Sequence, residues 1–226
     1  MPEKHNTIMI RKSEISLLKA NLLSILLLAV VAGVLIPLFN WICPEKFMSN
    51  LDNTLFVKLL HGVLDIIPIA TPTMGGVVGG IFGILYSVVV FAVLTIIPHE
   101  LIHGLTAMVV GKAQWTDLKF GMLWKKCAAY CHCNKALTVA QYRYFLLMPN
   151  LILGIIPSVL SLILGNSLLL VYGMIGIVAS IGDISMAWML RKESATTKVY
   201  DHPSTAGYFL FDTDEELEEI KKELLN

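Results

Sequence analysis

Two histidines and a glutamate stand together in the motif PHELIHG, inside an otherwise apolar stretch of the sequence. His99 and His103 are four residues apart, so on a helix both imidazoles project from the same side, one turn from each other. Two imidazoles in this arrangement can bind one zinc ion, and Glu100 can take a proton from a metal-bound water. The pattern therefore predicts a zinc site, with His99 and His103 as ligands and Glu100 as the catalytic base of a hydrolase.

A catalytic zinc site needs a third protein ligand, and Asp183 is the candidate. It is the only charged residue between Arg143 and Arg191. Burying a charge inside a membrane costs at least about 2.5 kcal/mol, so a carboxylate there needs a partner or a function. His103 lies eight residues before Gly111, and Asp183 likewise lies eight residues before Arg191. Both side chains are therefore expected about 12 Å from the cytoplasmic ends of their helices, where they can meet.

The composition is that of an integral membrane protein. Of the 226 residues, 56% are hydrophobic and 15% are charged, and a net charge of zero gives no reason to expect a nucleic-acid partner. The sequence predicts four transmembrane helices, each able to cross a core about 30 Å thick, at residues 20–39, 81–110, 144–164 and 168–190. Residues 46–67 carry several charges at helical spacing with apolar residues, so we expect an interfacial helix there and no fifth span.

The distribution of Lys and Arg predicts the orientation. With the N-terminus in the cytoplasm, 15 of the 17 Lys and Arg residues fall in the inner segments, and only Lys46 and Lys58 fall in the outer ones. Cytoplasmic loops retain the positive excess, so both termini are expected in the cytoplasm. In the fourth span, Gly173, Gly176 and Gly182 are expected to let that helix approach the second one closely.

The segments outside the spans predict two further elements. Apolar residues alternate with polar ones on either side of a turn at Gly121–Lys126, which predicts a small β-hairpin at the cytoplasmic face between the second and third spans. The fold class is therefore all-α integral membrane, with this one hairpin. Residues 1–192 are expected to form a single membrane-embedded domain, and residues 193–226 a cytoplasmic tail with a solvated amphipathic helix.

Two further groups of residues admit two interpretations each. His132 could donate a hydrogen bond to the reaction's oxyanion, or belong with Cys127, Cys131 and Cys133 to a structural metal site, although their spacing is not that of common zinc modules. Asn150 could contact substrate or cap a helix broken by Pro149, and capping is favoured. His202 is expected to be an ordinary surface residue.

Five motifs together resemble a known family: PHELIHG, AYCHCNKAL, YRYFLLMPNLILGIIP, SIGDI and DHPSTAGYFLFD. In this order, over residues 95–211, the sequence resembles the zincin peptidase family of small bacterial membrane proteins, which is similar to the site-2 intramembrane metalloproteases. The resemblance implies that His99, His103 and Asp183 bind Zn²⁺ and that Glu100 is the base. Asp183 is followed by Ile, whereas site-2 proteases commonly have Gly at that position.

These features predict a zinc-dependent endopeptidase that cleaves membrane proteins or peptides near the cytoplasmic face of a cell membrane, with a bacterial origin implied by the family. The expected partners are a membrane protein or peptide substrate and the lipid bilayer. Two alternatives stay open. The four intramembrane ionisable groups could relay protons or metal ions in a transporter, or the protein could be a metal-bound scaffold without catalytic activity.

Overall fold

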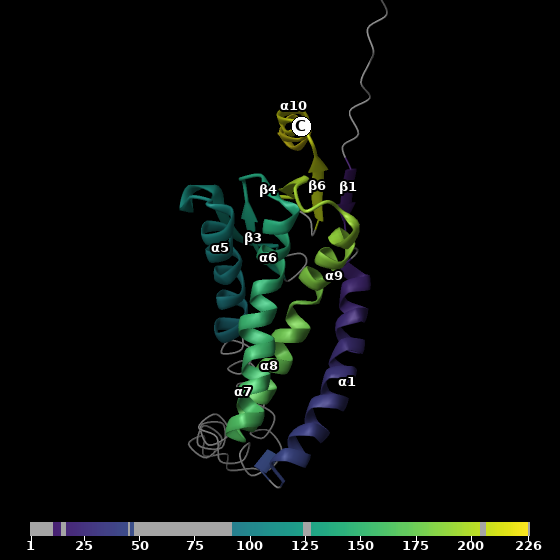
Figure 1. Ribbon diagram of the computed structural model, residues 1–226, viewed down its shortest axis with the longest axis vertical. Helices are drawn as coiled ribbons and strands as arrows, with labels where there is room; N and C mark the ends of the chain where they lie inside the picture. Colours follow the sequence, from purple (N-terminus) through teal and green to yellow (C-terminus); the bar gives the residue numbers. More distant parts are fainter. Residues whose placement is uncertain are drawn as a thin grey trace, which may run out of the picture. The chain divides into compact units, whose positions relative to one another are not determined.

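The computed structural model of the protein describes residues 11–14, 17–44, 46–47, 92–123, 128–203 and 207–225 (Figure 1). The chain forms two compact units: unit 1 comprises Met1–Leu23, Glu100–Met148 and Ser180–Asn226, and unit 2 comprises Ser24–His99 and Pro149–Ala179. The predicted interfacial helix lies, apart from residues 46 and 47, outside the described residues, and so do residues 81–91 of the predicted second span.

Most described residues are helical. The α-helices are α1 (Leu17–Ile42), α5 (Ile97–Gly111), α6 (Val139–Pro149), α7 (Ile156–Leu164), α8 (Ser167–Ala179), α9 (Ile181–Met189) and α10 (Asp214–Leu225). Two π-helical segments, η1 (Ala92–Ile96) and η4 (Asn150–Ile155), lead into α5 and α7, and two short 3₁₀ helices are η2 (Trp115–Asp117) and η5 (Leu190–Lys192). The division between the units falls inside α5, between His99 and Glu100, so one helix fixes the spacing of these two residues.

Three described helical stretches are long and apolar enough to cross a membrane, namely Leu22–Ile42, Val93–Gly111 and Val139–Leu164. A fourth is present if α8 and α9 with η5 form one span, although they meet at a bend of 45° near Ser180. These stretches overlap the four predicted spans, and the span predicted over residues 168–190 contains a bend that the sequence did not indicate. The count of four and the orientation stay predictions.

The third stretch begins earlier than predicted, at Val139 instead of residue 144, and the cause is a capping box. The Thr138 amide donates to the Gln141 side chain at 2.9 Å, and the Gln141 amide donates to the Thr138 hydroxyl at 3.3 Å. These two reciprocal bonds satisfy amide groups that the first helical turn leaves without partners. The sequence T-x-x-Q is the signal that marks this start.

In unit 2, glycines bring α8 against α7 and η4, which lie side by side in Figure 1. A Cβ atom on Gly176 would collide with the Leu153 carbonyl oxygen and lie 2.9 Å from the Gly154 amide nitrogen. One on Gly173 would lie 2.7 Å from the Ser158 amide nitrogen. The predicted approach of these glycines to the second span is therefore wrong: their partner is the third span. Gly182 has open space around its Cβ position.

In unit 1, a four-stranded antiparallel sheet adds to the predicted fold, so the all-α prediction with one hairpin is incomplete. The strands are β1 (Arg11–Glu14), β4 (Leu137–Thr138), β5 (Lys198–Asp201) and β6 (Gly207–Phe211), in the order β1-β6-β5-β4. β1 pairs with β6 along Arg11–Leu210 to Glu14–Gly207, across most of the chain's length. Every residue of β6 is buried.

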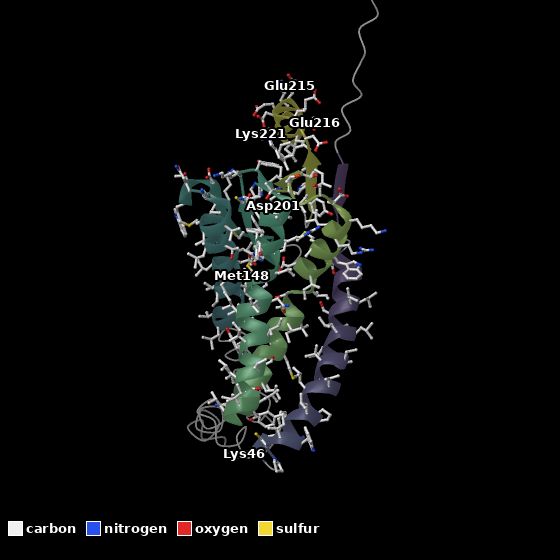
Figure 2. The ribbon with its side chains drawn as sticks, in the orientation of Figure 1. Lys46, Met148, Asp201, Glu215, Glu216 and Lys221 are labelled. Carbon is white, nitrogen blue, oxygen red and sulfur yellow. The ribbon has the colours of Figure 1, made fainter. Side chains whose placement is uncertain are left out.

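Helix α10 covers one part of this sheet. Ile220 is completely buried against Tyr200, Phe209 and Phe211, and Leu217 and Leu224 pack on the same cluster. A helix is present where the amphipathic helix was predicted, and its apolar face packs on the sheet and is not solvated. Its charged side chains, Glu215 among them, extend to the outside, whereas Asp201 lies inside unit 1 (Figure 2).

The predicted hairpin is present as strands β2 (Leu118–Leu123) and β3 (Ala128–Cys133), which pair antiparallel from Leu118–Cys133 to Leu123–Ala128. Its predicted position at the cytoplasmic face stays a prediction. The hairpin packs on α5 at Gly104, where a Cβ atom would lie 2.8 Å from the Phe120 ring and 3.2 Å from Leu118. The absence of a side chain at Gly104 therefore lets β2 lie directly over the turn that follows His103.

Candidate metal site

Helix α5 positions the histidine pair. His99 and His103 are both buried, with 8% and 4% of their surfaces exposed, and the intervening Glu100 is partly exposed. The start of this helix is irregular, because Pro98 has no N–H to donate to the Leu94 carbonyl four residues before it. That carbonyl accepts a hydrogen bond from the Tyr172 hydroxyl at 2.8 Å. The π-helical segment η1 ends directly before Ile97.

Helix α9 positions the carboxylate. Asp183 lies in its first turn, just after the bend at Ser180, and its side chain is 15% exposed. The positive end of a helix dipole stabilises a carboxylate in this position. The bend therefore stabilises the Asp183 carboxylate, because it creates a new helix N-terminus next to this charge.

Asp183 and His103 face each other. His103 Nε2 lies 3.3 Å from Asp183 Oδ2, and on the other side of the ring His103 Nδ1 donates to the Phe145 carbonyl at 2.7 Å. A carbonyl can only accept, so the hydrogen is on Nδ1 and the Nε2 lone pair of a neutral imidazole points at the carboxylate. Two acceptor atoms at this distance need a proton or a cation between them. A metal-binding histidine commonly has its second nitrogen held in this way.

The third member of the group is His99. One ligand atom each from His99, His103 and Asp183 lie within 4.8 Å of one another, and this is the one such group among the residues that the structure describes. Two ligands of a tetrahedral zinc ion, each about 2.0–2.1 Å from it, are about 3.3–3.4 Å apart. The separation of 3.3 Å between His103 Nε2 and Asp183 Oδ2 matches that value. Two imidazoles and one carboxylate also form a usual catalytic zinc set, so these residues fit the ion.

Glu100 is electrostatically coupled to the hairpin. Burial raises the pKa of the Cys131 thiol well above its usual range, and the negative charges of Glu100 and Asp201 raise it further. The charge of Glu100 therefore acts on a side chain of β3. Cys131 is therefore a neutral, unreactive side chain beside the site.

His132, the second predicted contact of the reaction, has both ring nitrogens engaged elsewhere. Its Nδ1 donates to Asp201 Oδ2 at 3.0 Å, and its Nε2 lies 2.9 Å from Asn134 Oδ1. It is 2% exposed and is not part of the three-ligand group. An oxyanion contact would require His132 to give up one of these bonds, and this role stays a prediction.

The cysteines next to His132 do not form a metal site with it among the described side chains. Cys131 and Cys133 are buried free thiols, and burial raises the pKa of Cys133 to about 11. Neither converges with His132 on a common point, as alternation along β3 requires. Cys127 lies outside the described residues.

Asn150 is the first residue of η4, and the helix continues through it from α6 to α7. The predicted break at Pro149 is therefore absent, and Asn150 caps no helix. Its Oδ1 atom is buried and has no hydrogen-bond partner in the described part of the chain. A contact between Asn150 and substrate stays a prediction.

Sequence reasoning missed the network of hydrogen bonds centred on Asp201 in unit 1. Asp201 accepts bonds from Tyr142, His132 and the Cys133 amide. No pattern in the sequence predicts this role of Asp201, and the prediction that His202 is an ordinary surface residue is wrong, because His202 is 8% exposed and stacked on Phe209. A signal for the buried surroundings of His202 was present, because the apolar run YFLF between Gly207 and Asp212 is typical of a buried strand.

Residues 92–197 match the model of one protein family, whose description is "Putative zincin peptidase". This match confirms the family resemblance predicted from the sequence motifs, and its range contains His99, Glu100, His103 and Asp183. A search of curated proteins and a search of solved structures each gave no match. A zincin-like peptidase implies zinc, which agrees with the donor set of the three-ligand group.

Proposed function

We propose, proceeding from the zincin peptidase match of residues 92–197, that this protein is a zinc-dependent endopeptidase that cleaves membrane proteins or peptides near the cytoplasmic face of a cell membrane. The observation that carries the proposal is the group of three ligand atoms, from the buried His99 and His103 and the partly buried Asp183, within 4.8 Å of one another. The apolar helices that could cross a membrane support the location.

Each residue of the site has a distinct part in this chemistry. His99, His103 and Asp183 would hold the ion, and a fourth position would be left for water or substrate. Zinc, when bound, lowers the pKa of a water molecule toward neutrality and polarises the substrate carbonyl. Glu100 follows His99 on α5 and is partly exposed, so its carboxylate can accept the proton of the attacking water and return it to the leaving amine.

The hairpin supplies a way to present the substrate. An intact transmembrane helix hides its amides in its own hydrogen bonds, so a substrate segment must unwind before cleavage. Among the described strands, β2 pairs with β3 alone, and it packs on α5 at Gly104, next to His103. An unwound segment added along the other edge of β2 would keep its backbone hydrogen-bonded beside the site.

Metal content tests the site first. The protein is purified in detergent, and zinc per chain is measured for wild type and for His99→Ala, His103→Ala and Asp183→Ala. We expect about one zinc in wild type and loss of it in each variant, because each removes one of three protein ligands. The matched control is Glu215→Gln on the exposed face of α10, which should keep the zinc. Unchanged zinc in Asp183→Ala would contradict the ligand assignment.

Cleavage then separates the peptidase from the two alternatives. Reconstituted membrane peptides should be cut by wild type and by Glu215→Gln, and at least about 100-fold more slowly by Glu100→Gln, which should retain zinc. A transporter would instead show ion flux that is lost in Glu100→Gln and no cleavage product. A metal-bound scaffold would contain zinc and show neither activity.

A further inference from the structure

Helix α6 makes directional contacts with three other parts of unit 1 from a stretch of five residues. Gln141 Nε2 donates to the Val110 carbonyl at 3.1 Å, and the Tyr142 hydroxyl donates to Asp201 Oδ1 at 2.6 Å. Arg143 Nη2 donates to the Leu190 carbonyl at 2.5 Å and to the Glu193 carbonyl at 3.2 Å. The Phe145 carbonyl accepts a bond from His103 Nδ1 at 2.7 Å. One of the partners is α5, which carries the candidate histidines, and another is η5 with the residue after it, which directly follows the aspartate helix α9.

Arg143 binds the C-terminal end of the aspartate helix. The last carbonyl groups of a helix have no partners within it, and a guanidinium group can donate to more than one of them. Arg143 is partly buried and reaches the carbonyls of Leu190 and Glu193, where α9 passes through η5 into the following loop. Fixing this end of the helix fixes both its rotation and its position along its axis.

The bonds of Arg143 also restrict the position of Asp183, because Asp183 lies on α9. It lies seven residues before Leu190, and seven residues are nearly two helical turns, so both residues lie on the same side of the helix. The same α6 holds the other ligand through the Phe145 carbonyl, two residues after Arg143. Met186 of α9 and Leu190 of η5 also pack in one apolar cluster with Phe145 and Leu146 of α6. The apolar contacts permit sliding, whereas the two guanidinium bonds do not.

We propose that Arg143 is a positioning residue that holds Asp183 at metal-binding distance from His103. It touches neither the ligand atoms nor the substrate, and it acts through the backbone of α9. This inference rests on the proposed zinc site. In the sequence, Arg143 serves only to predict orientation, as one of the Lys and Arg residues in the segments expected to face the cytoplasm.

The test measures zinc affinity by competition with a chelator whose colour reports its own metal load. Arg143→Ala should bind zinc about tenfold more weakly than wild type, the lower range for residues that orient ligands. Arg143→Met keeps the aliphatic stem but has no donor, and it should show the same weakening with less effect on folding. The matched control is Arg191→Ala. Arg191 carries the same charge at the same helix end, but its contacts stay on Trp188 of its own helix, so we expect wild-type affinity.

A spectroscopic measurement separates positioning from general stability. The absorption spectrum of bound Co²⁺ depends on the ligand set, so the spectra of Arg143→Ala and Arg143→Met should shift toward that of Asp183→Ala. A loss of stability alone would leave the spectrum of the folded protein unchanged. Wild-type affinity and a wild-type spectrum in either folded variant would overturn the role of Arg143 but leave the zinc site in place. No metal binding by wild type would overturn both.

Discussion

The contacts inside unit 1 differ in kind from those inside unit 2. In unit 2, α8 meets η4 and α7 through backbone atoms, because Gly173 and Gly176 leave no room for side chains. Two serine hydroxyls of this unit bond locally, with Ser158 Oγ donating to the Gly154 carbonyl at 2.8 Å and Ser161 Oγ donating to the Ser158 carbonyl at 2.6 Å. In unit 1, side chains such as those of Arg143 and Asp201 join elements that are far apart in the sequence.

The difference agrees with the predicted location of the apolar helices of unit 2 in a membrane. Lipid would give these helices no hydrophobic reason to associate, so small residues and close backbone contact would hold unit 2 together there. Unit 1 contains a sheet, a hairpin and a charged helix, so it can combine apolar clusters with directional hydrogen bonds. Most of the candidate site lies in unit 1, where ligand positions depend on hydrogen-bond geometry.

The largest expected effect on stability comes from Asp201→Ala, which tests the role of directional hydrogen bonds in unit 1. It removes the acceptor for the Tyr142 hydroxyl, His132 Nδ1 and the Cys133 amide, and leaves three largely buried donors without it. We expect the free energy of unfolding in detergent to fall by about 4 kcal/mol. Asp212→Ala, at an exposed position after β6, should change it by less than about 0.5 kcal/mol. Equal effects of the two substitutions would show that Asp201 is not a structural hub.

The next effect tests whether α10 is part of unit 1 or an appended tail. Ile220 is completely buried against Tyr200 and Phe209, so Ile220→Ala should lower the free energy of unfolding by about 3 kcal/mol. Lys222→Ala, on the exposed side of the same helix, is the control and should have little effect. If chemical denaturation gave the same midpoint for both variants, α10 would not contribute to the core.

The parts of the site that the sequence predicts are those marked by a short motif or by an uncommon residue. The spacing of His99 and His103 defines their geometry on any helix, and Asp183 was identified because a carboxylate inside an apolar span is costly. The structure brings these three together. The bend at Ser180 and the π-helical segments η1 and η4 have no comparable signal, because each depends on how neighbouring helices pack.

The missed parts of the fold depend on pairing over long sequence distances. β1 and β6 are at opposite ends of the chain, so neither Arg11–Glu14 nor Gly207–Phe211 reveals its partner by its own pattern. The glycines of α8 show the complementary failure. Their composition correctly indicated close approach, but a glycine carries no information about which helix approaches it.

A smaller effect tests close backbone packing in unit 2. Gly176→Ala places a Cβ atom against the Leu153 carbonyl oxygen, and backbone must move to accommodate it. We expect a loss of about 2 kcal/mol in unfolding free energy. Gly33→Ala in α1, whose Cβ position has open space, should have the opposite sign and stabilise the helix by up to about 1 kcal/mol. Two losses of similar size would show that contact with the Leu153 carbonyl does not set the cost at Gly176.

The smallest effect concerns the buried thiol of the hairpin, and its sign follows from its pKa. Burial raises the pKa of Cys133 from 9.0 to about 11, so between these values the unfolded chain has lost the proton and the folded chain has kept it. Stability should therefore fall as pH rises from 9 to 11, by about 1 kcal/mol from this group after allowance for solvent screening. Cys133→Ser keeps a donor for the Lys135 carbonyl but does not titrate in this range, so thermal unfolding in detergent should show a shallower decline. Between pH 6 and 8 the two proteins should have the same slope, and parallel curves above pH 9 would mean that water reaches this thiol in the folded protein.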